Sequence, residues 1–184
     1  MGTDQGLGEA IQRVIQQGVF HRFEEDERSS AVPKRHDKFF FQSAIQGKES
    51  SILLDILFEA NPYPVCQAVA IQSSLLVPSG EPTLVACPAP ECLLGDKLTA
   101  FAPHTTGILY GKDKELEIIK QLYDLGLLFD VVHNLDLVAG TFHTIADQEL
   151  AYRGLHHLST ANVLADSFAT ACLIGMRGYG APEE

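Results

Sequence analysis

The first sixty residues combine one helical pattern with a series of strand-like patterns. Apolar residues Ile11, Val14 and Val19 recur on one face over residues 6–20, which predicts an amphipathic helix. The following segment, HRFEEDERSSAVPKRH at residues 21–36, breaks this pattern with charges, serines and a proline. Such a composition is typical of a mobile connection between two elements.

Two β-rich runs come next, at residues 38–46 and 51–58, separated by the polar segment GKES. This spacing predicts a β-hairpin. Because side chains alternate along a strand, Ile52 and Leu54 share one face and Asp55 points to the other. The segments YPVCQAVAIQSSLLV and TLVAC predict further strands.

The second half of the chain has only helical patterns. Helices are predicted at residues 91–102, 113–133, 143–157 and 160–177. The order of helix, antiparallel strands and then helices alone indicates an α+β fold. We therefore expect a partial, mostly antiparallel sheet domain over residues 1–90, followed by a helical domain over residues 91–184.

Composition narrows the class of protein. A chain of 184 residues can bury one good core, and its 46% hydrophobic and 20% charged residues suit a soluble globular protein. No apolar run reaches the roughly 18 residues of a membrane-spanning helix, and the N-terminus lacks a signal-peptide pattern, so we expect a cytoplasmic protein without membrane contact. The net charge of −11 argues against general electrostatic binding of nucleic acid, although it leaves a local basic site open.

Three charged residues stand inside apolar runs. Asp55, within LLDIL, either lies on a strand face open to water or has a cation, a metal or hydrogen-bond donors beside it. Lys97 stands at the edge of an apolar helical stripe, where it either extends its ammonium to water or contacts phosphate oxygens. Asp124, within IIKQLYDLGLLF, caps a neighbouring group, pairs with a lysine or orients a catalytic one.

Together these residues match a known pattern. The blocks ECLLGDKLTAFAP and KELEIIKQLYDLGLLFD resemble the AbiEii/AbiGii toxin family of nucleotidyltransferases, and the order of elements agrees over residues 6–175. The resemblance implies an active site that includes Lys97 and Asp124. The strand carboxylate of the wider nucleotidyltransferase fold is then Asp55, and the three residues are expected to converge on one cleft.

The resemblance also implies a reaction, in which a nucleoside monophosphate passes from a nucleoside triphosphate (NTP) to an acceptor and pyrophosphate is released. Lys97 would neutralise triphosphate charge, Asp55 would bind Mg²⁺, and Asp124 would position Lys97 or the nucleotide. An RNA acceptor and an antitoxin encoded nearby are further implications of the same resemblance.

Two motifs of that family are missing from the sequence. The family carries a G-G or G-S turn and a D-x-D strand, whereas GLG at residues 6–8 opens a helix and no D-x-D occurs. We therefore expect a fragment or a natural truncation that is inactive by itself. The alternative is a non-catalytic protein-interaction module derived from a nucleotidyltransferase. A metal hydrolase has little support, because His156 and His157 are adjacent and cannot share one helix face.

Overall fold

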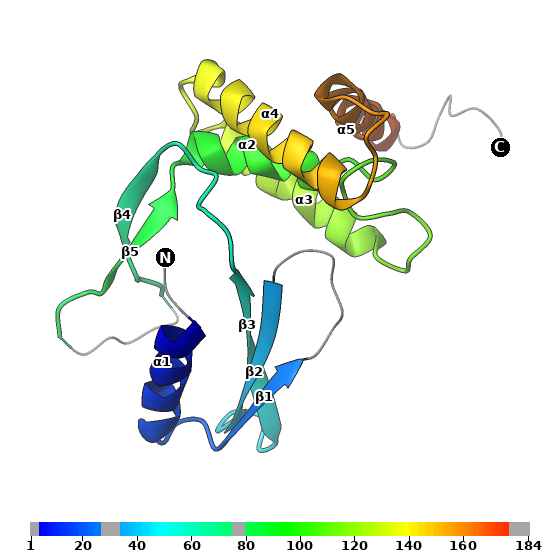
Figure 1. Cartoon of the computed structure of the whole chain (residues 1–184). Helices are drawn as coiled ribbons and strands as arrows, with labels where there is room; N and C mark the ends of the chain where they lie inside the picture. Colours follow the sequence, from blue (N-terminus) through cyan, green and yellow to red (C-terminus); the bar gives the residue numbers. More distant parts are fainter. Residues whose placement is uncertain (1–3, 27–33, 75–79, 177–184) are drawn as a thin grey trace. The chain divides into compact units, whose positions relative to one another are not determined.

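The computed structural model describes residues 4–26, 34–74 and 80–176. The chain forms two compact units, Met1–Asn61 and Pro62–Glu184. The boundary expected at residue 90 therefore falls inside the second unit, which contains a β-hairpin as well as the helices (Figure 1). Small antiparallel sheets and helices together confirm the predicted α+β class.

The first unit consists of one helix and a three-stranded antiparallel sheet. Helix α1 (Asp4–Gln16) is followed by β1 (Arg22–Asp26), β2 (Lys34–Gln42) and β3 (Glu49–Leu57), which lie in the order β1-β2-β3 (Figure 1). The predicted helix and hairpin are thus confirmed. The helix ends before Gly18, whose φ of +78° suits glycine and cannot continue the helix.

The prediction of a mobile connection at residues 21–36 was wrong in part. Its first residues form the edge strand β1, and its last three belong to β2, while residues 27–33 lie outside the described residues. Phe23 stands opposite Phe39 in the register, with ring centroids 5.1 Å apart, and the guanidinium of Arg22 lies 3.5 Å from the ring centroid of Phe40. Cross-strand aromatic contacts therefore stabilise β1, although its many charged residues give no strand pattern in the sequence.

The second unit opens with the antiparallel hairpin of β4 (Cys66–Ala70) and β5 (Leu84–Pro88). Four helices follow: α2 (Pro90–Ala100), α3 (Glu115–Phe129), α4 (Leu135–Tyr152) and α5 (Thr160–Gly175). The predicted start of α4 at residue 143 was wrong by two turns. The side chain of Asn134 accepts a hydrogen bond from the backbone N–H of Leu137 at 3.1 Å, so the helix begins with an N-cap that the apolar pattern did not reveal.

The helices of the second unit enclose two clusters of buried side chains. The first is contributed by α2 with the residue that follows it, by α3 and by α4, and contains Leu94, Phe101, Ile118, Leu125 and Val138. The second joins the end of α2 to α4 and α5, and contains Ala102, Phe142, Ala146, Leu150 and Val163. The half-buried side chain of Leu98 packs against both clusters, so α2 is the central element of this unit.

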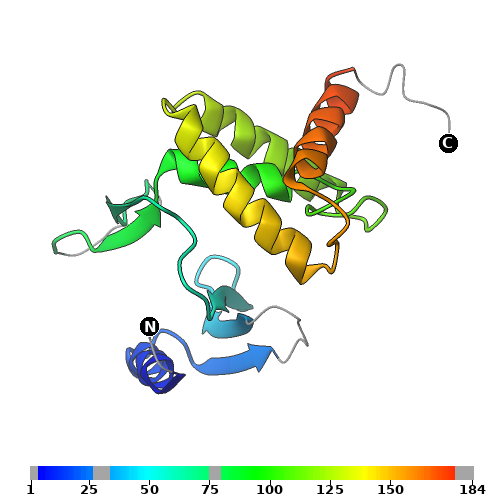
Figure 2. The ribbon, with the colours of Figure 1, turned by 45° about the horizontal axis from the view of Figure 1, so that its top comes forward.

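Helices α2 and α4 touch through their backbones, as their adjacent courses in Figures 1 and 2 illustrate. A Cβ atom at Gly95 would lie 2.7 Å from the carbonyl oxygen of Val138 and 2.8 Å from the backbone nitrogen of Phe142. Glycine is therefore required where α2 crosses α4. None of the helices in the described part of the chain is long and apolar enough to cross a membrane.

Candidate active site

Lys97 and Asp124 meet between α2 and α3. The ammonium nitrogen of Lys97 donates hydrogen bonds to Oδ2 of Asp124 and to Oε1 of Gln121, both at 2.9 Å. The side chains of Lys97 and Asp124 are 32% and 27% exposed, so the pair lies at the surface of the unit with one side open to solvent. Lys97 thus neither extends into bulk water nor sits in the core.

The sequence of each helix explains this placement. Lys97 lies in the last turn of α2, where the helix dipole favours a cation. Gln121 and Asp124 are three residues apart on α3, so their side chains share one face, and Leu125 beside them is buried in the core. The sequence analysis missed Gln121, although the same three-residue spacing from Asp124 could have pointed to it.

A second carboxylate lies next to this pair on α2. The hydroxyl of Tyr63 donates a hydrogen bond of 2.7 Å to Oδ2 of Asp96. Burial raises the pKa of Asp96 above the ordinary aspartate value of 3.8, and the hydrogen bond from Tyr63 partly opposes this shift. Burial, together with the bond to the carboxylate, also raises the pKa of Tyr63 above 10. The sequence analysis did not single out either residue, because their contact joins positions 33 residues apart.

Asp55 belongs to the first unit. Its carboxylate is 72% exposed on β3, and its Oδ1 lies 2.5 Å from Nδ1 of His36 on the neighbouring strand. An antiparallel sheet with one face in water accounts for this exposure, and His36 is a partner that the sequence analysis did not name. The convergence of Asp55 with Lys97 and Asp124 stays a prediction, because the latter two lie in the second unit.

The fit of Mg²⁺ can be tested on the side chains present. Among residues 4–26, 34–74 and 80–176, no group of three or more His, Cys, Asp or Glu side chains is placed to hold a metal ion. Mg²⁺ takes a near-octahedral set of oxygen ligands, whereas Asp55 offers one carboxylate paired with an imidazole. The described residues therefore supply no preformed set of three protein ligands for Mg²⁺, and magnesium binding at Asp55 stays a prediction.

Comparison with known proteins identifies the class to which this arrangement belongs. The family described as "Nucleotidyl transferase AbiEii toxin, Type IV TA system" matches residues 3–171. The chain belongs to this family of nucleotidyltransferase toxins from toxin–antitoxin systems, as its Lys97 and Asp124 blocks predicted. Searches of curated proteins and of solved structures gave no match to the chain.

Proposed function

We propose that Lys97, Asp124 and Gln121 form part of a nucleoside triphosphate site that serves the transfer of a nucleoside monophosphate to an acceptor, with release of pyrophosphate. The observation that carries this proposal is the paired but accessible ammonium of Lys97. Family membership supports nucleotidyltransferase chemistry. The acceptor proposed is RNA, and an antitoxin is the proposed protein partner.

The hydrogen bonds of the Lys97 ammonium leave it able to bind a phosphate group. An ammonium has three hydrogens, and Asp124 and Gln121 accept two of them, so the third is available to a phosphate oxygen. The two acceptors also hold the flexible side chain in one orientation before the ligand arrives. Phosphoryl transfer depends mainly on such positioning and on neutralisation of charge, and pre-orientation lowers the cost of both.

Asp124 acts in this proposal as a positioning residue. Its carboxylate holds the ammonium in place, and the open side of the pair gives a ligand access to the remaining N–H of Lys97. Gln121 orients the same nitrogen without adding charge. The ammonium is therefore fixed in position, but Asp124 offsets its charge, so most of the triphosphate charge must be met elsewhere.

Nucleotide binding by the full chain tests the proposal directly. Equilibrium dialysis with each labelled NTP should show about tenfold weaker binding for Lys97→Met, and a smaller loss for Asp124→Asn. Lys120→Met is a matched control, because it removes the same charge from an exposed position of α3. Equal affinities for Lys97→Met and Lys120→Met would contradict the proposal.

Transfer is expected to fail with this chain alone. When the chain is incubated with Mg²⁺, labelled NTPs and total RNA, we expect no labelled RNA, because the described residues offer no cluster of carboxylates for a hard divalent ion. Robust labelling of RNA by the chain would show that this expectation is wrong. If labelling occurs, its loss in Asp55→Ala and in Lys97→Ala would support the assignment of both residues.

A protein-interaction module is the second candidate function, and one observation favours it. Helix α3 exposes Leu116, Ile119, Tyr123 and Leu127, which follow one another at helical spacing, with Leu116 83% and Tyr123 65% exposed. An apolar stripe of this kind suits a protein partner such as the antitoxin. Leu116→Glu should then abolish co-purification with the antitoxin, whereas Lys97→Met should leave it unchanged. If neither variant changes co-purification, α3 is not the contact surface.

A further inference from the structure

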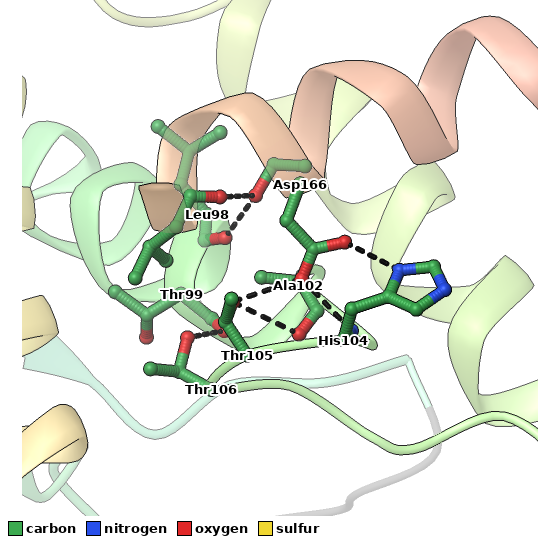
Figure 3. A network of polar contacts seen from close by, with 9 residues as sticks. Leu98, Thr99, Ala102, His104, Thr105, Thr106 and Asp166 are labelled. Atoms are coloured by element: carbon green, nitrogen blue, oxygen red, sulfur yellow. Dashed lines mark hydrogen bonds and ion pairs between the residues drawn. The ribbon is translucent and has the colours of Figure 1, made fainter. Parts of the chain in front are cut away.

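A buried carboxylate on α5 organises the loop that follows α2. The side chain of Asp166 is 5% exposed, and Figure 3 shows three groups converging on it. Its Oδ2 accepts hydrogen bonds from the backbone N–H of His104 and from the hydroxyl of Thr105, both at 2.8 Å. Its Oδ1 lies 2.8 Å from Nδ1 of His104.

This arrangement fixes the tautomer and the orientation of the His104 ring. An ionised carboxylate can only accept, so Nδ1 carries the hydrogen and Nε2 of the neutral ring carries a lone pair. The ring is 69% exposed and points away from the network, while its Nδ1 edge faces Asp166 (Figure 3). Tyr110 packs against it in a T-shaped contact, with ring centroids 5.1 Å apart. Nε2 is therefore oriented and accessible.

The side chains around His104 limit the reactions in which Nε2 can take part. Within the described ranges, no cluster of three or more metal-ligating side chains includes His104, and no serine, threonine or cysteine side chain hydrogen-bonds to Nε2. Among these residues, His104 therefore has no hydroxyl or thiol hydrogen-bonded to Nε2 that it could activate as a general base. It also has no further side chains with which to bind a metal ion in this part of the structure. An imidazole with its Nδ1–H fixed by a buried carboxylate can itself act as a nucleophile.

We propose that His104 is a nucleophile that accepts a nucleotidyl group on Nε2, forming a phosphoramidate. The choice of an NTP as donor rests on the proposed function. The lone pair of Nε2 attacks the α-phosphorus, so that an N–P bond forms and the bond from this phosphorus to the bridging oxygen breaks. Pyrophosphate leaves with the electron pair. The ring gains one positive charge, which the carboxylate of Asp166 balances through the Nδ1–H hydrogen bond.

His143 provides a matched comparison within the same chain. Its ring is also exposed, and its Nδ1 is also hydrogen-bonded, but the partner is the hydroxyl of Thr160 at 2.8 Å. A hydroxyl can donate or accept, so it fixes neither the tautomer nor a balancing charge. Both rings are exposed and differ in the partner of Nδ1, so a difference in reactivity between His104 and His143 is expected to come from Asp166.

The test uses adenosine 5′-phosphorimidazolide, whose phosphorus is already activated and needs no NTP site. The full chain is exposed to this reagent, and acid-labile, alkali-stable adducts are mapped by mass spectrometry. We expect His104 to react about tenfold faster than His143, and His104→Gln to lose this adduct while the His143 adduct persists. Asp166→Asn should bring the two rates together. Equal rates for His104 and His143 in the wild-type chain would overturn the proposal, whatever the folding of the variants.

A second incubation, with Mg²⁺, labelled NTPs and total RNA, separates this inference from the proposed function. Labelled protein that loses its label in His104→Gln supports both the nucleophile and its donor. Labelled RNA without labelled protein overturns the role of NTP as donor to His104 and leaves the proposed function standing. If neither is labelled while the phosphorimidazolide reacts selectively, the nucleophile is supported, and the missing step is the use of an NTP by this chain alone, as the lack of a carboxylate cluster for Mg²⁺ among the described residues leads us to expect.

Discussion

Lys97 and Asp124 are 27 residues apart in sequence, yet the ammonium nitrogen of the first lies 2.9 Å from a carboxylate oxygen of the second. This contact joins α2 to α3 at the surface of the helical unit. Its partial exposure decides what it contributes to folding, since ion pairs that water reaches stabilise proteins by about 0–1 kcal/mol.

Lys97→Met is therefore expected to change the free energy of unfolding by less than about 1 kcal/mol. The apolar replacement removes a charge from an apolar edge, and Asp124 can turn its carboxylate to water. Urea denaturation followed by far-UV circular dichroism measures this, since the chain contains no tryptophan. A loss of several kcal/mol would make Lys97 a structural ion-pair partner and would weaken the argument for a phosphate contact.

Two leucines of α2 should differ in their effect on stability. Leu94 is fully buried in the cluster shared with α3 and α4, so Leu94→Ala should cost about 2–5 kcal/mol. Leu98 packs against both clusters but is half-buried, so Leu98→Ala should cost less, near the lower end of that range. The same denaturation measurement tests the order. A larger loss for Leu98→Ala would show that contact with both clusters outweighs full burial.

Asp96 should make stability depend on pH. Folding raises the pKa of Asp96, so the folded protein binds this proton more tightly than the unfolded chain does. Proton binding therefore contributes fully to the free energy of unfolding below about pH 3.8. This contribution is lost as the pH rises through the raised pKa. Asp96→Asn should therefore melt at a higher temperature than wild type at pH 7, with the difference shrinking toward pH 4. Asp147→Asn, at an exposed site on α4, is the control. Parallel melting curves at all pH values for Asp96→Asn and wild type would contradict this expectation.

The first unit contains a buried ion pair. Oδ1 of Asp37 accepts a hydrogen bond of 2.7 Å from Nε of Arg35, the carboxylate is fully buried, and its Oδ2 has no hydrogen-bond partner. Arg35→Met leaves this charge uncompensated and should cost about 3–5 kcal/mol.

The double variant Arg35→Met/Asp37→Leu is the control for this loss, because it removes both charges together. It should recover most of the stability. Hydrogen exchange of the β2 backbone amides follows this unit separately from the helices. If the double variant is as unstable as Arg35→Met, the loss comes from the arginine's other contacts and not from the unpaired carboxylate.

The helical half was predictable because its apolar patterns are long. The helix predicted over residues 113–133 corresponds to α3, Glu115–Phe129, and the buried Leu125 lies on its apolar face. The strand β1 was missed because an edge strand can be rich in charge, and its contact between Phe23 and Phe39 depends on register with a strand further along the chain. Local periodicity carries no information about such a pairing.

The candidate site shows the same division. Lys97 and Asp124 stood out because each is a charge in an apolar run, whereas Tyr63 and His104 looked ordinary in sequence. The partner of Tyr63 is 33 residues away and that of His104 is 62 residues away. Contacts over such separations are set by tertiary packing, so the polar partners of a site become visible only in three dimensions.

The backbone contact at Gly95 has a mechanical consequence. A helix that meets its neighbour without intervening side chains cannot rotate or slide without a collision, so we expect α2 and α4 to move together. Lys97 lies on α2, whereas Asp124 and Gln121 lie on α3. Any adjustment that accompanies phosphate binding is therefore expected in α3, which can shift its two acceptors while the cation stays in place.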